Sequence, residues 1–450
     1  MKRSNTKYVI VYAICAISMA CILSSCDKFL DITPTGKVIA ETGEEYRALL
    51  TYEYKYFPKD RFLTTVRTDE LIMNKNTSST DLDAYLDLWR WKDEDPSTTT
   101  TYFLWRSYYH TIYIANYVIE HQNDITHASA DEVSQMVGEA YMMRAYCHFL
   151  LVNLYAEPYT HCQPAITRGI PVMTEADVNI IPGSSSEEAV YQQVLEDLTQ
   201  AQHFLTVKEW EKGENYRFNI TSAQALLART YLYMGRWQEA LTAAKSVIAE
   251  HGELEDLNTS ATLPNSYLSV ESIVALERFS TNLYTVIDRP SPAFISQYRT
   301  GDQRRTKFYK RATSSTYNLL KGGADDYACS FRSAEAYLTA AEAAARQGQT
   351  DTARDYLLQL ARKRYNSDAY DATQQLVADM NADDLTTEIL EERARELAFE
   401  GHRWYDLRRT TQPALTHEYE GQTYTLTPDR YTMRFPTEAV EANPEIERWE

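Results

Sequence analysis

The sequence predicts a mainly α-helical fold in which dispersed helix pairs form a scaffold that carries loop-rich insertions and a few short strands. Residues 219–251 and 333–364 carry this prediction, because apolar residues recur in both with helical spacing on either side of a glycine. A third observation is that helical periodicity stops at residue 253 and gives way to Tyr-, Arg-, Ser- and Thr-rich sequence. A helix pair cannot bury its apolar face alone, so the pairs are expected to pack on other helices.

The first pair begins at a residue suited to capping and turns at a glycine. The Asn219 side chain can accept hydrogen bonds from free N–H groups at a helix start. Gly235 adopts the left-handed conformation of a C-cap without steric cost, and Gly348 has the same place in the second pair. The pattern resembles a tetratricopeptide repeat at Leu227, Ala228, Tyr231, Gly235, Trp237, Ala240 and Ala244. The turns are far apart in sequence, so the repeats are dispersed rather than tandem.

Composition limits the class of partner. The 450 residues carry a formal net charge of −19, which argues against nucleic acid, because phosphate contacts need clustered Lys and Arg. Tyr is frequent, with 34 Tyr against 13 Phe, and its rigid ring with a polar tip suits half-wet recognition surfaces as well as packing between helices. Few cysteines follow the leader, so no disulfide framework is expected, and a Cys147–Cys162 pair is left open.

The N-terminus has the pattern of a targeting segment. Three basic residues precede an apolar stretch at 8–23, which fits the hydrophobic region of a secretory signal. The stretch ends in Leu-Ser-Ser-Cys at 23–26, which resembles a bacterial lipoprotein box. This resemblance implies that residues 1–25 are a lipoprotein signal peptide and that Cys26 carries a thioether-linked diacylglycerol and an acyl chain. The alternative is an ordinary signal followed by a chance cysteine.

Several motifs in a fixed order resemble the SusD/RagB family. The mature start CDKFLDITP at 26–34, the R-A-Y motif at 144–146 and the helix ILEERARELAFEGHRWYDLRR, predicted to open at Thr386, carry most of the resemblance. Weaker matches lie at residues 105–119, 169–172, 271–276 and 434–444. The resemblance implies a SusD-like fold with a helical N-terminal region at 26–255, a C-terminal region at 256–450 and one compact unit over 26–450.

The same resemblance implies a function. Members of this family are expected to be non-enzymatic lipoproteins on the surface of the outer membrane. They capture oligosaccharides and deliver them to a SusC-like TonB-dependent transporter. A RagB-like role in peptide uptake is the alternative, with cationic peptides conceivable because the chain is acidic. A surface glycosidase is a less favoured alternative.

No motif for a cofactor, a metal or a nucleophile occurs in the chain, so neither a cofactor nor a metal is expected, although a structural calcium ion is left open. Acidic and basic residues cluster in the 386–409 helix, but each acid there has an Arg one turn away, which keeps carboxylates ionised and favours a structural network. That cluster comprises Glu392, Arg393, Glu396, Glu400, Arg403 and Asp406. A glycosidase is still possible, because its carboxylates are set by spacing in space rather than in sequence.

The ligand surface is predicted on two polar insertions that bear aromatic residues, 74–100 and 280–325. Residues 41–100 are expected to be rich in loops. In an extended segment Trp89 and Trp91 would share one face and form a stacking platform, which Tyr85 would join if the run stayed extended. The candidate ligand-binding residues are Trp89, Trp91, Tyr85, Tyr284, Arg289 and Tyr298. The alternative for the tryptophans is that they fill the core beneath a loop.

Overall fold

The structure is a computed structural model that describes residues 40–73, 79–93, 96–278, 288–322 and 327–447. The described helices are α2 (Gly43–Tyr56), α3 (Leu63–Val66), α4 (Ser79–Trp89), α5 (Trp105–Glu120), α6 (Ala130–Tyr155), α7 (Glu187–Phe204), α8 (Ile220–Tyr233), α9 (Trp237–His251), α10 (Pro292–Ile295), α11 (Arg304–Lys307), α12 (Ser333–Arg346), α13 (Thr350–Arg364), α14 (Ser367–Ala378), α15 (Ala382–Glu396), α16 (Arg403–Arg409) and α17 (Thr437–Ala442). Short 3-10 turns are η2 (Tyr159–His161), η4 (Pro428–Arg430) and η5 (Pro444–Ile446).

The strands of the described residues are short and pair in antiparallel twos. They are β1 (Leu71–Met73), β2 (Ser272–Val274), β3 (Glu277–Arg278), β4 (Asp288–Pro290), β5 (Tyr309–Arg311), β6 (Tyr317–Leu319), β7 (Tyr327–Ala328), β8 (Phe331–Arg332), β9 (Leu415–Tyr419) and β10 (Gln422–Leu426). The pairs are β1–β4, β2–β8, β3–β7, β5–β6 and β9–β10. Strand β2 lies within residues 271–276, one of the segments that resemble the SusD/RagB family. The mainly α-helical fold class with a few short strands is therefore confirmed.

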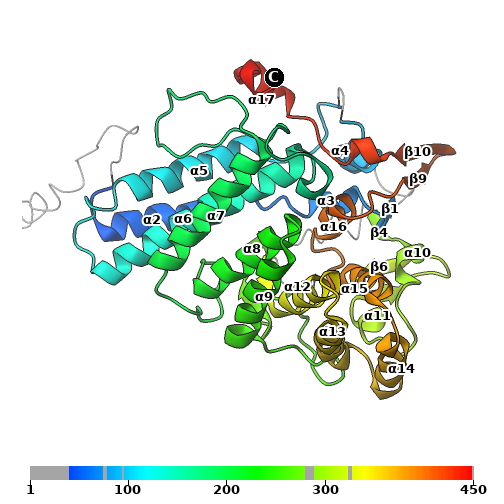
Figure 1. Cartoon of the computed structure of the whole chain (residues 1–450). Coiled ribbons are helices and arrows are strands. Elements are labelled where there is room, and N and C mark those ends of the chain that lie inside the picture. Colours follow the sequence, from blue (N-terminus) through cyan, green and yellow to red (C-terminus); the bar gives the residue numbers. More distant parts are fainter. Residues whose placement is uncertain (1–39, 74–78, 94–95, 279–287, 323–326, 448–450) are drawn as a thin grey trace, which may run out of the picture.

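The N-terminal half is organised around α6. Figure 1 shows α5, α6 and α7 side by side, with α2 beside α6. Every residue from Met142 to Tyr155 is buried, because α6 has neighbours on all sides. The R-A-Y motif has a structural role: Arg144 of α6 donates hydrogen bonds to Asp197 of α7 at 2.9 and 2.5 Å and to Asn116 of α5 at 2.8 Å. One guanidinium thus ties three helices together.

The two predicted helix pairs are present and pack on each other. Asn219 caps α8, and Gly235 and Gly348 turn the chain with φ of 71° and 73°. Helix α12 lies between α9 and α13 and also contacts α15 (Figure 1). Its residues from Ser333 to Ala345 are all buried, and their many alanines let the neighbouring helices approach closely.

Two local expectations were wrong. Residues 41–100 are not mainly loops, because α2 and α4 occupy much of this segment. The predicted helix from Thr386 is in fact two helices, α15 and α16, and α15 begins earlier, after the N-cap Asn381. The chain breaks between them because Phe399 and Gly401 have left-handed φ values of 61° and 72°. Gly401 also approaches Arg61 so closely that a Cβ there would lie 2.6 Å from the Arg61 carbonyl oxygen.

The acidic and basic residues of α15 form a buried network, as predicted. The Glu396 carboxylate accepts hydrogen bonds at 2.8–2.9 Å from the guanidiniums of Arg304, Arg332 and Arg364. Burial raises the pKa of the Glu396 carboxyl, but the three guanidiniums outweigh this effect and lower its pKa well below its usual range. The network joins α11, β8, α13 and α15, and its role is structural.

The cysteines of the described residues, Cys147, Cys162 and Cys329, are all free, so Cys147 and Cys162 are not bonded to each other. The main hydrophobic core includes residues from Ala40 to Ile446 in both halves of the chain, and a small second cluster contains Ala334, Leu338, Leu360 and Leu397. Within the described ranges, every helix is either too short or too polar to cross a membrane.

Candidate functional site

The predicted tryptophan platform is wrong, because both rings lie in the core. Trp89 and Trp91 are only 1% and 0% exposed. Their rings enclose the imidazole of His417, with centroid distances of 4.3 and 4.2 Å, and the Trp91 Nε1–H donates to the Arg67 carbonyl oxygen at 2.9 Å. The prediction failed because α4 runs to Trp89, so the spacing rule for extended chain does not apply. The alternative, a core plug beneath a loop, is the observed arrangement.

The other predicted residues are also unsuited or undescribed. Tyr298 is 2% exposed and its hydroxyl donates to the Arg395 carbonyl oxygen at 2.7 Å, so it belongs to the core. Tyr85 is half-buried against the core. Arg289 is half-buried and donates to the Asn318 side chain. Tyr284 lies outside the described residues.

Strand β1 immediately precedes the first predicted insertion, and β4 lies within the second. Strand β1 pairs with β4, so that Leu71 lies opposite Pro290 and Met73 opposite Asp288. The described residues there form no aromatic platform from the predicted set.

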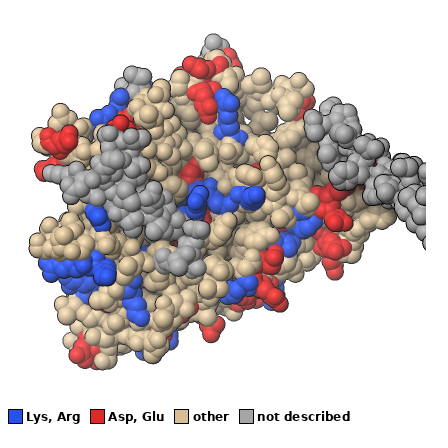
Figure 2. Space-filling view, turned by 180° about the vertical axis from the view of Figure 1, so that it is seen from behind, with Lys and Arg blue, Asp and Glu red and all other residues tan. Residues whose placement is uncertain are grey.

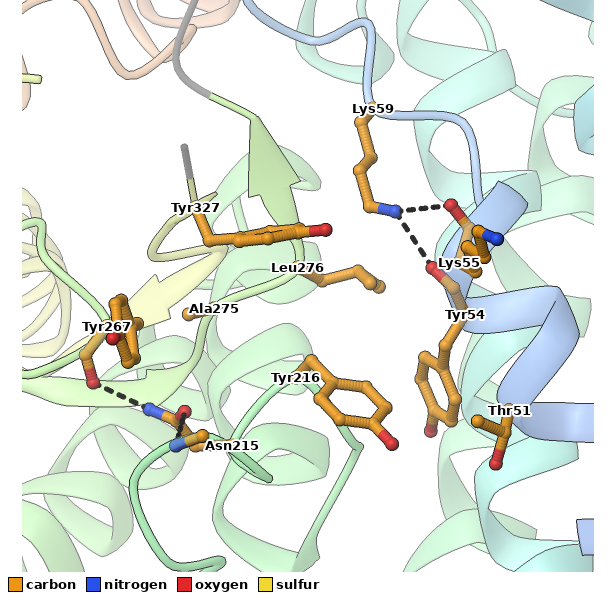
Figure 3. A pocket seen from close by; sticks show the side chains of 11 residues that line it. Thr51, Tyr54, Lys55, Lys59, Asn215, Tyr216, Tyr267, Ala275, Leu276 and Tyr327 are labelled. Carbon is orange, nitrogen blue, oxygen red and sulfur yellow. Dashed lines mark hydrogen bonds between the residues drawn. The ribbon is translucent and has the colours of Figure 1, made fainter. Parts of the chain in front are cut away.

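An open pocket of about 550 Å³ lies between α2 and the strands of the C-terminal half (Figure 3). Its walls come from α2 and the residues that follow it, the loop before α8, the segment between β2 and β3, and β7. The lining residues are Thr51, Tyr54, Lys55, Lys59, Gly213, Asn215, Tyr216, Tyr267, Ala275, Leu276 and Tyr327. Four of these eleven residues are tyrosines.

The end of α2 positions one side of the pocket. The helix ends before Phe57, because the residue ahead of Pro58 is disfavoured in helical conformation. The chain then turns so that the Lys59 ammonium donates to the carbonyl oxygens of Tyr54 and Lys55 at 2.9 and 2.8 Å (Figure 3). A cation at the end of a helix stabilises its free carbonyl groups. An ammonium has three N–H donors, so one donor of Lys59 has no partner among the described residues.

Asn215 fixes the opposite wall. Its Nδ2 donates to the carbonyl oxygen of Tyr267 at 2.8 Å and to Ser272 Oγ at 3.0 Å. Its own carbonyl oxygen accepts from the Ala275 N–H at 2.8 Å. These bonds join the loop before α8 to the segment around β2, and they hold the neighbouring Tyr216 at the pocket wall (Figure 3).

Two tyrosines present usable surface to the pocket. Tyr327 is 50% exposed, and Tyr216 is half-buried with its ring edge-to-face on Tyr54 at 5.4 Å. Within the described part of the chain, neither hydroxyl has a hydrogen-bond partner. Each side chain therefore offers an apolar ring face and a free polar tip, which is the combination that contacts the C–H faces and hydroxyls of a sugar.

The lining side chains of the pocket differ from the usual carboxylate pair of a glycosidase. No carboxylate and no imidazole is among its lining side chains. The carboxyls of Glu70 and Asp60 have pKa values raised by burial, to about 7 and about 6, but both are fully buried and absent from the pocket lining. Nor do the described residues gather three His, Cys, Asp or Glu side chains in a metal-binding arrangement.

None of the pocket residues was among the predicted site residues, because the prediction was based on tryptophans and long insertions. The available signal was the run TYEYKYFPK at 51–59, which places three tyrosines and two lysines within nine residues. Tyr216 and Tyr327 lie far from this run in sequence, and no local pattern links them to it. Only the pairing of β3 with β7 and the bonds of Asn215 bring them together.

The structure is that of a mainly α-helical protein with dispersed helix pairs and an open pocket lined in part by tyrosines. A family model described as "Starch-binding associating with outer membrane" matches residues 31–232, and one described as "SusD family" matches residues 273–446. Together they extend over most of the chain, in the order that the sequence motifs indicated. The chain belongs to the SusD family.

Relatives and solved structures agree with this assignment. SusD-like protein P38 of Formosa agariphila is 24% identical over 510 aligned positions, which cover 95% of this chain and 96% of that protein. A SusD superfamily protein from Bacteroides thetaiotaomicron has a TM-score of 0.76 at 22% identity and covers 91% of this chain and 100% of its own. A laminarin-binding SusD-like protein has a TM-score of 0.63 at 21% identity, with 82% and 92% covered. The SusD-like fold is therefore confirmed, and the family is one of carbohydrate-binding proteins associated with the outer membrane.

Proposed function

We propose that this protein is a non-enzymatic surface lipoprotein that captures oligosaccharides in the tyrosine-lined pocket. The observation that carries the proposal is that exposed Tyr327 and half-buried Tyr216 both line an open pocket whose described lining side chains include no carboxylate. Aromatic faces would stack on sugar rings, and the hydroxyls would bond the sugar's own hydroxyls. Such a site is open and wet, so modest affinity is expected. The laminarin-binding relative supports a glycan as the ligand.

The proposal includes an anchor and a transporter. A lipid on Cys26 would hold the protein at the outer membrane, and a SusC-like TonB-dependent transporter would receive the glycan from it. Cys26 lies outside the described residues, and the described core begins at Ala40, so the lipid would attach ahead of the folded unit. The family description, which places the family at the outer membrane, supports this arrangement.

The charge of the lining residues argues against a cationic peptide as the ligand. Cationic peptides were conceivable because the chain is acidic, but the pocket has two lysines and no acid among its lining residues. A cationic peptide would meet like charge there. The glycosidase alternative has no carboxylate at the pocket to support it.

The test of glycan capture is direct binding. The purified full-length protein in mild detergent would be titrated with a panel of neutral and acidic oligosaccharides by isothermal calorimetry. We expect saturable binding of at least one glycan, with no product formed on prolonged incubation. Failure to bind any member, or hydrolysis of one, would contradict the proposal.

Cys26→Ser tests the anchor. The variant should lose its lipid and leave the membrane fraction, while its circular dichroism spectrum and melting temperature stay unchanged because Cys26 precedes the described core. The measurement is membrane fractionation of cells that express either form without the transporter. Recovery of the variant in the outer membrane would show that another feature anchors the protein.

A further inference from the structure

The charge of the pocket is opposite to that of the chain. The sequence has 64 acidic against 45 basic residues, yet the lining of the pocket contains Lys55 and Lys59 and no Asp or Glu. Neither ammonium forms an ion pair with a described carboxylate, since Lys59 bonds two carbonyl oxygens and the Lys55 ammonium lies 5.3 Å from the Tyr56 ring centroid. Figure 2 shows one face of the molecule, on which both basic and acidic side chains occur, with a short row of basic side chains near its middle and a further basic group at the lower left.

The charges around the pocket reinforce this sign. Glu277 and the exposed Glu214 are nearby acids. Glu277 is buried, the Tyr146 hydroxyl donates to it at 2.9 Å, and Arg61 lies 3.5 Å from it. Arg278, the next residue, is exposed. Burial lowers the pKa of Lys59, Glu277 raises it, and the positive charge of Arg278 lowers it again, so Arg278 acts as a third cation near the pocket. Glu214 lies in the loop between two lining residues but is not itself a lining residue.

We propose that the pocket selects acidic glycans, in which a sugar carries a carboxylate or a sulfate ester. This inference rests on the proposed function and names the ligand class of the same site. Its basis is that the exposed ring of Tyr327 lies close to the ammonium of Lys59, which has one N–H without a partner among the described residues.

The geometry joins the two parts of this recognition. The Lys59 ammonium lies 5.9 Å from the centroid of the Tyr327 ring (Figure 3). A sugar stacked on that ring would place a substituent at its edge within reach of the ammonium. A charge-assisted hydrogen bond from an ammonium to a carboxylate or sulfate oxygen is about twice as strong as a neutral one. A neutral sugar would gain only the stacking and the weaker bonds.

The test compares matched glycans that differ only in charge. One pair is an oligogalacturonate and the same oligomer with its carboxyl groups reduced to alcohols, and the other is a sulfated oligogalactan and its desulfated form. Binding to the full-length protein in mild detergent would be measured by calorimetry at low and at high salt. We expect the charged member of at least one pair to bind about tenfold more tightly at low salt, with the advantage shrinking as salt screens the lysines. The two pairs distinguish carboxylate from sulfate recognition.

Variants assign the charge effect to the pocket. Lys55→Gln should weaken binding of the charged oligomer about two- to fivefold and leave the neutral one unchanged, as for removal of one exposed charge. Lys245→Gln is the matched control, because Lys245 is exposed on α9, which does not line the pocket, and the change in net charge is the same. Lys59→Gln should have the larger effect on the charged oligomer. Its melting temperature must be measured too, because Lys59 also binds the end of α2.

The outcomes separate this inference from the proposed function. If neutral glycans bind as tightly as their charged counterparts, or if Lys245→Gln matches Lys55→Gln, the acidic-glycan inference is overturned and glycan capture stands. If no glycan binds, both are overturned. If an acidic peptide displaces the charged oligomer and binds more tightly than it does, the pocket recognises peptides and the inference is likewise overturned.

Discussion

Two aromatic clusters of this protein have opposite environments. Trp89 and Trp91 enclose His417 and are almost fully buried, and the Trp91 Nε1–H bonds the Arg67 carbonyl oxygen. Tyr216 and Tyr327 lie at an open pocket, and their hydroxyls have no partner among the described residues. The first cluster uses its rings to fix the 89–91 turn against β9, whereas the second leaves ring faces and hydroxyls for another molecule.

The difference shows that exposure and unused hydrogen-bonding capacity, rather than ring size, indicate a binding role. The same distinction applies to charges. The guanidiniums around Glu396 are satisfied by buried carboxylates, whereas the pocket lysines lack a carboxylate partner among the described residues. Changes in the interior should therefore alter stability, and changes at the pocket should alter binding.

Glu396→Gln should have the largest effect. The substitution leaves three buried guanidiniums short of one negative charge, and breaking a buried ion pair in this way costs ~3–5 kcal/mol of the free energy of unfolding. Urea unfolding followed by circular dichroism measures it. Glu391→Gln is the control, because Glu391 is 55% exposed and pairs with Arg395 at 3.6 Å, so it should cost less than ~1 kcal/mol. Equal effects would show that the network does not stabilise the core.

Glu70→Gln should remove a pH dependence. Burial raises the pKa of Glu70 from 4.5 to about 7, so its protonated form is favoured in the fold. A raised pKa contributes stability that is fully present below the unfolded value and is lost as pH rises through the folded value. The wild type should therefore lose ~2–3 kcal/mol between pH 5 and pH 8 from this group.

Glutamine suits the Glu70 site, because it can still accept the Phe399 N–H, bonded at 2.8 Å, and it can donate to Thr68 Oγ1. Unfolding free energies of wild type and variant would be compared across this pH range, so that other titrating groups cancel. The variant should be the more stable of the two at pH 8. A constant difference between the two proteins would contradict the assignment.

Trp91→Phe should have a smaller effect on stability. Phenylalanine keeps a ring against His417 but loses the hydrogen bond to Arg67, which leaves a buried carbonyl oxygen without its partner. The expected cost is ~1–2 kcal/mol, measured by urea unfolding. Glycan affinity should not change. Unaltered stability together with weakened binding would restore the tryptophan platform.

Much of the fold followed from the sequence because its signals are local. The caps and glycine turns of the two helix pairs depend on residues a few positions apart, as Asn219, Gly235 and Gly348 show. The break at Phe399 and Gly401 was missed because it depends on the close approach of Arg61, which is distant in sequence.

The site was harder to predict because its residues are distant in sequence. Sequence alone could not place Trp91 inside, since its partner His417 lies on β9, far along the chain. Tyr216 and Tyr327 join Lys59 only through strand pairing and side-chain bonds that no short pattern encodes.

The affinity of Tyr327→Ala for a glycan that the wild type binds tests the central claim most directly. Tyr327 is 50% exposed, so its removal should change the free energy of unfolding by less than ~0.5 kcal/mol. Tyr52→Ala is the control. Tyr52 is 56% exposed on α2, a helix that contributes to the pocket wall, but Tyr52 itself does not line the pocket. Calorimetry should show that Tyr327→Ala loses ~1–3 kcal/mol of binding free energy and that Tyr52→Ala binds as the wild type does. Unchanged affinity in Tyr327→Ala would contradict the assignment of the pocket as the glycan site.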